Sequence, residues 1–220
     1  MKRLMVVPHL LLDNAAALGE TPGWEVEGWR QPGEDDVTAA LTASAQAGLA
    51  LYVPPAAADV PLRLDRVLVP HDGTPNTAAS LSVASGLALR GRTEVVVLHV
   101  IETDMPDQAG TLPAPRMLDH DGDDWVEWRE EFGRRFFNGS PTTPRRLEVA
   151  VGSRSAMILR AARTLPADLI VMAWGGVLEA GRARTLRSVC CAAPCPVLLV
   201  ASRRQDDSEM RTPLALVQAS

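Results

Sequence analysis

Lysine is almost absent from this sequence. Lys2 is the only lysine in a chain of 220 residues, and the other 21 of its Lys and Arg residues are all arginine. A Walker-type phosphate loop requires a lysine beside its glycines, and Schiff-base chemistry requires a buried lysine amine. Lys2 lies at the start of the chain and belongs neither to such a loop nor to a buried site. The sequence therefore disfavours both of these large enzyme classes.

Cysteine is scarce as well. The three cysteines, Cys190, Cys191 and Cys195, fall within six residues of one another. An odd and clustered number does not build a disulfide framework, and the spacing lacks the second ligand pair of a zinc site. We interpret them as small buried side chains of a reduced, cytoplasmic protein.

Long apolar runs and an excess of positive charge are also missing. No segment reaches the roughly 18 consecutive apolar residues that a membrane span requires, and the first residues lack the features of a signal peptide. The formal net charge of −5 differs from the basic balance of proteins that bind nucleic acids non-specifically. We therefore expect neither a membrane nor a nucleic acid as partner.

Short β-branched runs alternate with helical patterns along most of the chain. The predicted strands are 66–70, 94–100, 147–151, 168–173 and 196–200, and the predicted helices are 75–88, 124–137 and 155–165. Several of these strands are apolar on both faces, which favours parallel strands covered by helices. The pattern predicts an α/β fold with an open parallel sheet.

The first 60 residues contain a faint internal echo. Val7-Pro8-His9 matches Val69-Pro70-His71, and residues 47–53 resemble residues 167–173. The echo is either chance similarity between Ala/Val-rich segments or a compressed partial copy of the later domain. We predict an N-terminal α/β extension over residues 1–60, a main domain over 61–203 and a loose tail over 204–220.

Four segments resemble the universal stress protein family, in the order and near the spacing of that family. They are Val67–Thr74, Val97–Val100, Ala167–Met172 and Ala193–Val200, all within residues 64–202. The resemblance implies a Rossmann-like, five-stranded parallel sheet of order 3-2-1-4-5 with helices on both faces. In such sheets ligands bind beyond the carboxyl ends of the strands, where the strand order reverses.

The resemblance also implies which residues hold a nucleotide. The crevice follows Pro70, and the residue matching Asp72 contacts the adenine and ribose in ATP-binding members. By position, His99 and Val100 line the base pocket. Read from the residues alone, Asp72 either binds ribose hydroxyls or organises its own turn ahead of Thr74.

The phosphate end departs from the family pattern. Nucleotide-binding members carry Gly-x-x-Gly and, nine residues later, Gly-Ser or Gly-Thr, and here Ala183-Arg184 stand at the second element. Such glycines let backbone N–H groups approach phosphates. Either phosphate binding is lost, or the arginines sit on a solvated helix face, or a different anion cradle forms. That cradle would comprise Gly175, Gly176, Gly181, Arg182 and Arg184, and Trp174 is a candidate to fill the empty site.

Other constellations carry less chemistry. The acidic run 119–124 suits a helix start better than a calcium loop, so we predict no metal. Trp125, Trp128, Phe132 and Phe136 have the spacing of a core stripe, or of an interface if they are exposed. His71 and His99 are predicted neighbours at adjacent strand ends. No nucleophile elbow or catalytic triad is recognisable, so we do not expect a conventional enzyme.

These observations lead to a binding or regulatory protein of the stress response with weakened or lost ATP binding. No cofactor is assigned, and ATP is the one that the resemblance suggests. We expect a homodimer through Pro196–Val200, because that apolar edge would otherwise leave backbone groups unpaired. The alternatives are an ATP-dependent switch with slow hydrolysis, and a structural role in which residues 1–60 cover the sheet.

Overall fold

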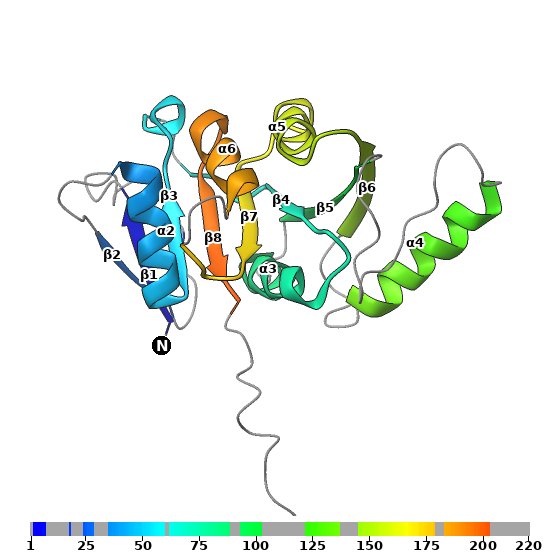
Figure 1. Ribbon diagram of the computed structural model, residues 1–220, viewed down its shortest axis with the longest axis horizontal. Helices are drawn as coiled ribbons and strands as arrows, with labels where there is room; N and C mark the ends of the chain where they lie inside the picture. The colour runs from blue at the N-terminus through cyan, green and yellow to red at the C-terminus, as the bar shows by residue number, and fades with distance from the viewer. Residues whose placement is uncertain are drawn as a thin grey trace, which may run out of the picture.

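Eight strands form one continuous sheet in the computed structural model (Figure 1). The structure describes residues 2–7, 18, 24–28, 35–59, 62–88, 93–102, 122–136, 145–178 and 183–202. The strands are β1 (Lys2–Val7), β2 (Trp24–Gly28), β3 (Leu49–Tyr52), β4 (Arg66–Pro70), β5 (Glu94–Ile101), β6 (Arg145–Val151), β7 (Leu169–Trp174) and β8 (Val197–Ala201). Their order across the sheet is β2-β1-β3-β8-β7-β4-β5-β6.

The last five strands have the predicted topology. They lie in the order β6-β5-β4-β7-β8, and every pairing among them is parallel. This is the order 3-2-1-4-5, with the reversal of strand order at β4 and β7. The observed strands differ from the five predicted ranges by two residues or fewer at either end.

The first three strands extend the same sheet. β1 pairs in parallel with β2 on one side and β3 on the other, and β3 pairs antiparallel with β8, from Leu49 opposite Val200 to Tyr52 opposite Val197. The expectation that Pro196–Val200 is a free edge for a second copy is therefore corrected. Strand β3 of the same chain already satisfies the backbone groups on that side.

The arrangement of these three strands bears on the predicted repeat. β1 lies between β2 and β3, as β4 lies between β5 and β7, and all four of these pairings are parallel. Val7 of the first matched segment ends β1, as Val69-Pro70 end β4, while Pro8 and His9 lie outside the described residues; the second pair of segments falls on β3 and β7. The division of the chain at about residue 60 and the partial copy remain predictions, and this arrangement favours them.

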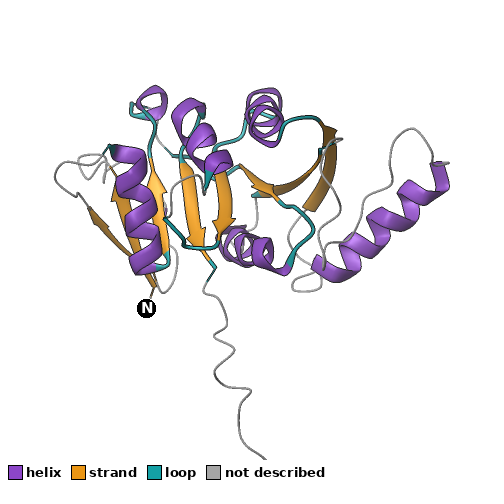
Figure 2. Ribbon diagram, viewed as in Figure 1, coloured by secondary structure: helices purple, strands orange, loops and turns teal. Residues whose placement is uncertain are grey.

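Five α-helices and one 3₁₀ turn accompany the strands in the described part of the chain. They are α2 (Asp36–Ala47), η3 (Pro55–Ala57), α3 (Pro75–Ala88), α4 (Gly122–Phe136), α5 (Arg154–Thr164) and α6 (Arg184–Ala192). Figure 2 shows the strands as one layer with helices around it. None of the described helices is long and apolar enough to cross a bilayer.

The two faces of the sheet have separate cores. On one face, α2, α5 and α6 pack against alternate strand residues such as Leu68, Ile170 and Leu199. On the other face, α3 and α4 pack against their neighbours, such as Val69 and Val171. Because successive side chains of a strand point to opposite faces, a central strand must be apolar throughout. The reading of these runs as covered parallel strands is confirmed.

A chain of polar contacts attaches α2 to the later domain. The indole Nε1 of Trp174 donates to Ser44 Oγ over 3.1 Å, and Ser44 Oγ donates to the Leu199 carbonyl over 3.3 Å. Arg187 of α6 donates to Thr38 Oγ1 over 2.9 Å. Both Trp174 and Ser44 are buried. The extension is thus fastened by its helix as well as by β3.

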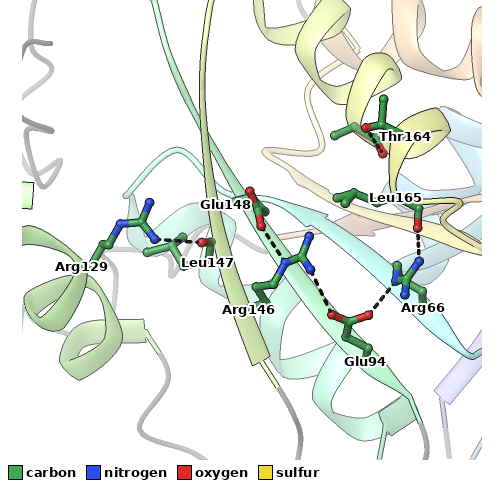
Figure 3. Close-up of polar contacts among 9 residues, drawn as sticks. Arg66, Glu94, Arg129, Arg146, Leu147, Glu148, Thr164 and Leu165 are labelled. Atoms are coloured by element: carbon green, nitrogen blue, oxygen red, sulfur yellow. Dashed lines mark hydrogen bonds and ion pairs between the residues drawn. The ribbon is translucent and has the colours of Figure 1, made fainter. Parts of the chain in front are cut away.

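Charged side chains connect β4, β5 and β6 at their amino ends (Figure 3). Arg66 Nε lies 2.7 Å from Glu94 Oε2, and Arg146 Nη1 lies 3.9 Å from Glu94 Oε1. Arg146 Nε also lies 2.6 Å from Glu148 Oε1. Arg66 Nη1 donates to the Leu165 carbonyl as well. This network lies at the end of the strands opposite to the predicted crevice.

Candidate functional site

A cleft opens at the carboxyl ends of β4, β5 and β7, where the strand order reverses. Its volume is about 130 Å³. Its wall is mainly apolar, with Leu98, Val100, Ile158, Met172 and Leu186 among the lining residues. The polar residues that line it are His71, Asp72, Thr77, Arg154 and Thr185. An apolar cleft with a few polar groups is the usual form of a small-molecule site.

Asp72 lies in the turn that leads from β4 to α3. Its Oδ1 accepts hydrogen bonds from the Thr74 N–H at 3.0 Å, from Thr74 Oγ1 at 2.6 Å and from Thr77 Oγ1 at 2.7 Å. Burial favours the neutral acid, but the hydrogen bonds from Thr74 and Thr77 outweigh it and lower the pKa of Asp72. Asp72 therefore organises its own turn, and the same hydrogen bonds keep its carboxylate ionised at the cleft.

His71 and His99 are neighbours, as predicted. His99 Nδ1 lies 3.0 Å from the His71 carbonyl, to which it donates. His71 Nδ1 accepts the Gly73 N–H at 3.0 Å, so the proton of the neutral ring is on Nε2. That Nε2 atom is buried and has no hydrogen-bond partner among the described residues.

Aromatic rings of α4 cover both histidines. The His71 ring lies 4.3 Å from the Phe136 ring, and the His99 ring lies 5.0 Å from the Trp128 ring. Burial lowers the pKa of His71 to about 4 and lowers the pKa of His99 too. Trp128 and Phe132 are buried, which confirms a packing stripe, while the side chain of Trp125 lies outside the described residues.

The predicted base-pocket residues separate into two groups. Pro70, Asp72 and Val100 line the cleft, and His99 does not. The alternation of β5 explains the difference, because Leu98 and Val100 face the cleft while His99 points to the α4 side. His99 acts instead as a buried support for the turn after β4.

The predicted phosphate residues do not gather at the cleft. Gly175 and Gly176 follow β7, Gly176 with a φ of +71°, and neither lines the cleft. Arg184 is the exposed first residue of α6. Gly181 and Arg182 lie outside the described residues. Trp174 does not fill the cleft either, since its ring binds Ser44 beneath α2.

The residue before α6 has an unusual backbone. Ala183 is at φ 56° and ψ 25°, and it is the only residue other than glycine with a positive φ in the described part of the chain. Left-handed backbone costs an alanine about 1 kcal/mol because of its Cβ. The helix start thus keeps a conformation that suits glycine, with a methyl group added.

Arg154 was not identified from the sequence. It is the first residue of α5 and lines the cleft together with Asp72. Its Nε lies 3.0 Å from Glu102 Oε2, and its backbone N–H donates to Glu102 Oε1 over 3.3 Å. The sequence could have identified Arg154, because Gly152-Ser153-Arg154 follows the third predicted strand and so lies at the same edge of the sheet as Asp72.

No group of three or more metal-ligating side chains occurs among the described residues. The acidic run 119–124 lies outside them, apart from the backbone of its last three residues in α4. The polar residues of the cleft supply one carboxylate, one guanidinium, two hydroxyls and the buried His71, beside a mainly apolar wall.

Comparisons with known proteins agree with this fold. The sequence pattern of the universal stress protein family matches residues 63–201. The chain belongs to the universal stress protein family. A search of the curated proteins found no match.

Solved structures of family members are similar to this chain. A universal stress protein from Archaeoglobus fulgidus DSM 4304 is 17% identical with a TM-score of 0.52, over 91% of this chain and 88% of that chain. One from Burkholderia pseudomallei is 25% identical with a TM-score of 0.41, over 63% of this chain and 97% of that chain. UspA from Lactobacillus plantarum is 19% identical with a TM-score of 0.41, over 63% and 98%. The first of these extends the likeness in fold to the N-terminal part.

Proposed function

We propose that this universal stress protein is a non-enzymatic binding and regulatory protein whose ATP binding is weakened or lost. The family suggests a role in the stress response. The observation that carries the proposal is Ala183, which adds a methyl group to a left-handed position at the start of α6. A methyl there obstructs the close approach of backbone N–H groups to phosphate, which glycine permits.

The rest of the cleft supports binding of a small molecule. Asp72 is kept ionised at the switch point of the sheet, and an apolar wall faces it. The three cysteines, all free, fit the reducing conditions of a cytoplasmic protein.

Titration calorimetry with ATP and Mg²⁺ tests the loss of ATP binding. We expect a dissociation constant weaker than about 1 mM for the wild type. The double variant Ala183→Gly with Arg184→Ser replaces both residues that depart from the family pattern, and we expect it to bind at least tenfold more tightly. Micromolar binding by the wild type that is lost in Asp72→Ala, and kept in the distant Asp59→Ala, would refute the proposal.

A nucleotide-dependent switch with slow hydrolysis is the second candidate. It is favoured by the start of α6, where Ala183 supplies no side-chain cap, because the uncapped N-terminus of a helix attracts an anion. ATP affinity and turnover that both fall in the double variant Arg182→Ala, Arg184→Ala would support it. Values unchanged from the wild type would remove it.

A further inference from the structure

Two opposite charges line the cleft without pairing with each other. Asp72 is the only Asp or Glu among the lining residues, and Arg154 is the only Lys or Arg. Within the described part of the chain no ion pair joins them. Both charges act on His99, whose pKa is lowered mainly by burial, raised by Asp72 and lowered further by Arg154. Because such effects weaken with distance, one negative and one positive group lie near the same ring, and their charges cancel.

Local contacts occupy only part of each charged group. The three hydrogen bonds of the Asp72 carboxylate all end on Oδ1, and Oδ2 accepts none among the described residues. Glu102 Oε2 lies 3.0 Å from Nε of Arg154, and Glu102 Oε1 accepts the backbone N–H of Arg154 over 3.3 Å. In the described ranges Nη1 and Nη2 of Arg154 have no partner. The carboxylate and the guanidinium are thus fixed by their neighbours and keep atoms for a ligand.

The start of α6 adds a hydroxyl to the cleft. Thr185 is the second residue of α6 and lines the cleft, and its hydroxyl makes no hydrogen bond within the described part of the chain. A guanidinium binds a carboxylate through two parallel N–H groups, and a hydroxyl can donate to the same carboxylate. Arg154 and Thr185 therefore favour an anionic group of a ligand, while the ionised Asp72 favours a cationic one.

The size and the wall of the cleft limit the rest of the ligand. An apolar cavity of about 150 Å³ holds one benzene molecule, and the volume here is about 130 Å³. The wall is formed mainly by aliphatic side chains, among them Leu98, Val100, Ile158, Met172 and Leu186. Burial of an apolar group against such a wall is favourable. The cleft therefore suits a branched or unbranched aliphatic group that is no larger than benzene.

We propose that the cleft binds a free α-amino acid with an aliphatic side chain, such as leucine. Its carboxylate pairs with Arg154, its ammonium group pairs with Oδ2 of Asp72, and its side chain lies on the apolar wall. At neutral pH such a molecule carries one charge of each sign, which matches the two charges of the cleft. The proposal rests on the small-molecule cleft of the proposed function and adds the class of ligand and the two residues that select it.

Titration calorimetry of the full chain with L-leucine and three analogues tests this assignment. Isocaproate keeps the carboxylate and the branched chain of leucine but lacks the ammonium group, and isoamylamine keeps the ammonium group but lacks the carboxylate. Glycine keeps both charges and lacks the side chain. We expect the wild type to bind L-leucine at least tenfold more tightly than each of the three analogues.

Two variants each remove one charge of the cleft. Arg154→Gln should weaken the binding of L-leucine at least tenfold and leave the binding of isoamylamine unchanged. Asp72→Asn keeps an acceptor for the Thr74 N–H, and it should weaken the binding of L-leucine to a similar extent without weakening that of isocaproate. Arg160→Gln is the matched control, because Arg160 is an exposed arginine of the same helix outside the cleft, and it should bind L-leucine as the wild type does.

Three results would overturn the assignment and leave the proposed function in place. They are equal binding of L-leucine and its analogues, an affinity for L-leucine that survives Arg154→Gln or Asp72→Asn, and failure of the folded wild type to bind L-leucine, L-valine and L-methionine. Micromolar ATP binding that depends on Asp72 would instead overturn the proposed function.

Discussion

Two single residues have roles that the sequence around them does not predict. Ala183 holds a backbone conformation that favours glycine, and Arg154 brings a charge to the cleft from the start of a helix. The position of Asp72 could be predicted, because a polar residue after an apolar strand lies at the sheet edge where ligands bind. The separation of His99 from Val100 depends on the pleat, and the sequence alone did not assign either residue to a face.

The histidine pair predicts a dependence of stability on pH. His71 has a pKa of about 4 in the folded protein, against 6.5 in the absence of burial. The unfolded chain therefore binds more protons between those values, and stability falls as pH drops from about 6.5 towards 4. The difference amounts to roughly 3 kcal/mol at most.

Urea unfolding from pH 7 to pH 4 measures this loss. His71→Asn retains an acceptor for the Gly73 N–H without a titrating group, so its stability should change less over the same range. Equal slopes for the variant and the wild type would show that another group is responsible, and His99 would be the next to replace.

Elements of the later domain follow from local patterns, and the contacts between them mostly do not. β4 was predicted with its observed bounds because Arg66–Pro70 lies between clear turn signals. The pairing of β3 with β8 was missed, because Leu49–Tyr52 is apolar throughout and its pattern does not distinguish a parallel from an antiparallel neighbour. The ion-pair network was also missed, since it joins residues that only the sheet register brings together.

That network predicts the effect of one conservative substitution. Glu94 accepts two arginines, Arg66 and Arg146, whereas Glu148 contacts Arg146 alone. Glu94→Gln should lower the free energy of unfolding by roughly 1 kcal/mol, since these side chains are partly exposed and screened. Glu148→Gln should cost less. Thermal unfolding in low salt and in 1 M NaCl measures both, and the cost of Glu94→Gln should shrink in high salt. A cost independent of salt would contradict the electrostatic explanation.

At the scale of the whole molecule, the chain's own N-terminal part covers the edge of β8. β3 and α2 lie where a second copy was expected, and Trp174, Ser44 and Leu199 are joined beneath them. We therefore expect one chain of 23.6 kDa in light scattering at micromolar concentration. A stable species of twice this mass would contradict that expectation.

Breaking β3 should reverse this state. Ala50→Pro removes an N–H that faces Leu199 of β8, because the Ala201 N–H donates to the Gly48 carbonyl and the hydrogen-bonded pairs alternate from there. β8 should therefore exchange its amide hydrogens faster and the chain should self-associate. Val26→Pro is the matched control, because β2 pairs with β1 and is separated from β8 by two strands, β1 and β3. It should leave both the mass and the exchange of β8 unchanged. Association of both variants would show that general unfolding is the cause.

The pairing of Leu49 with Val200 also affects how the chain folds while it is being synthesised. Synthesis runs from the N-terminus, so β1, β2 and β3 emerge long before the strand that completes their sheet. Until β8 is made, the apolar strand Leu49–Tyr52 has an open edge that can pair with another nascent chain. Contacts between residues so far apart in sequence also form slowly. We therefore expect a nascent chain to be most prone to associate with another between the synthesis of β3 and that of β8.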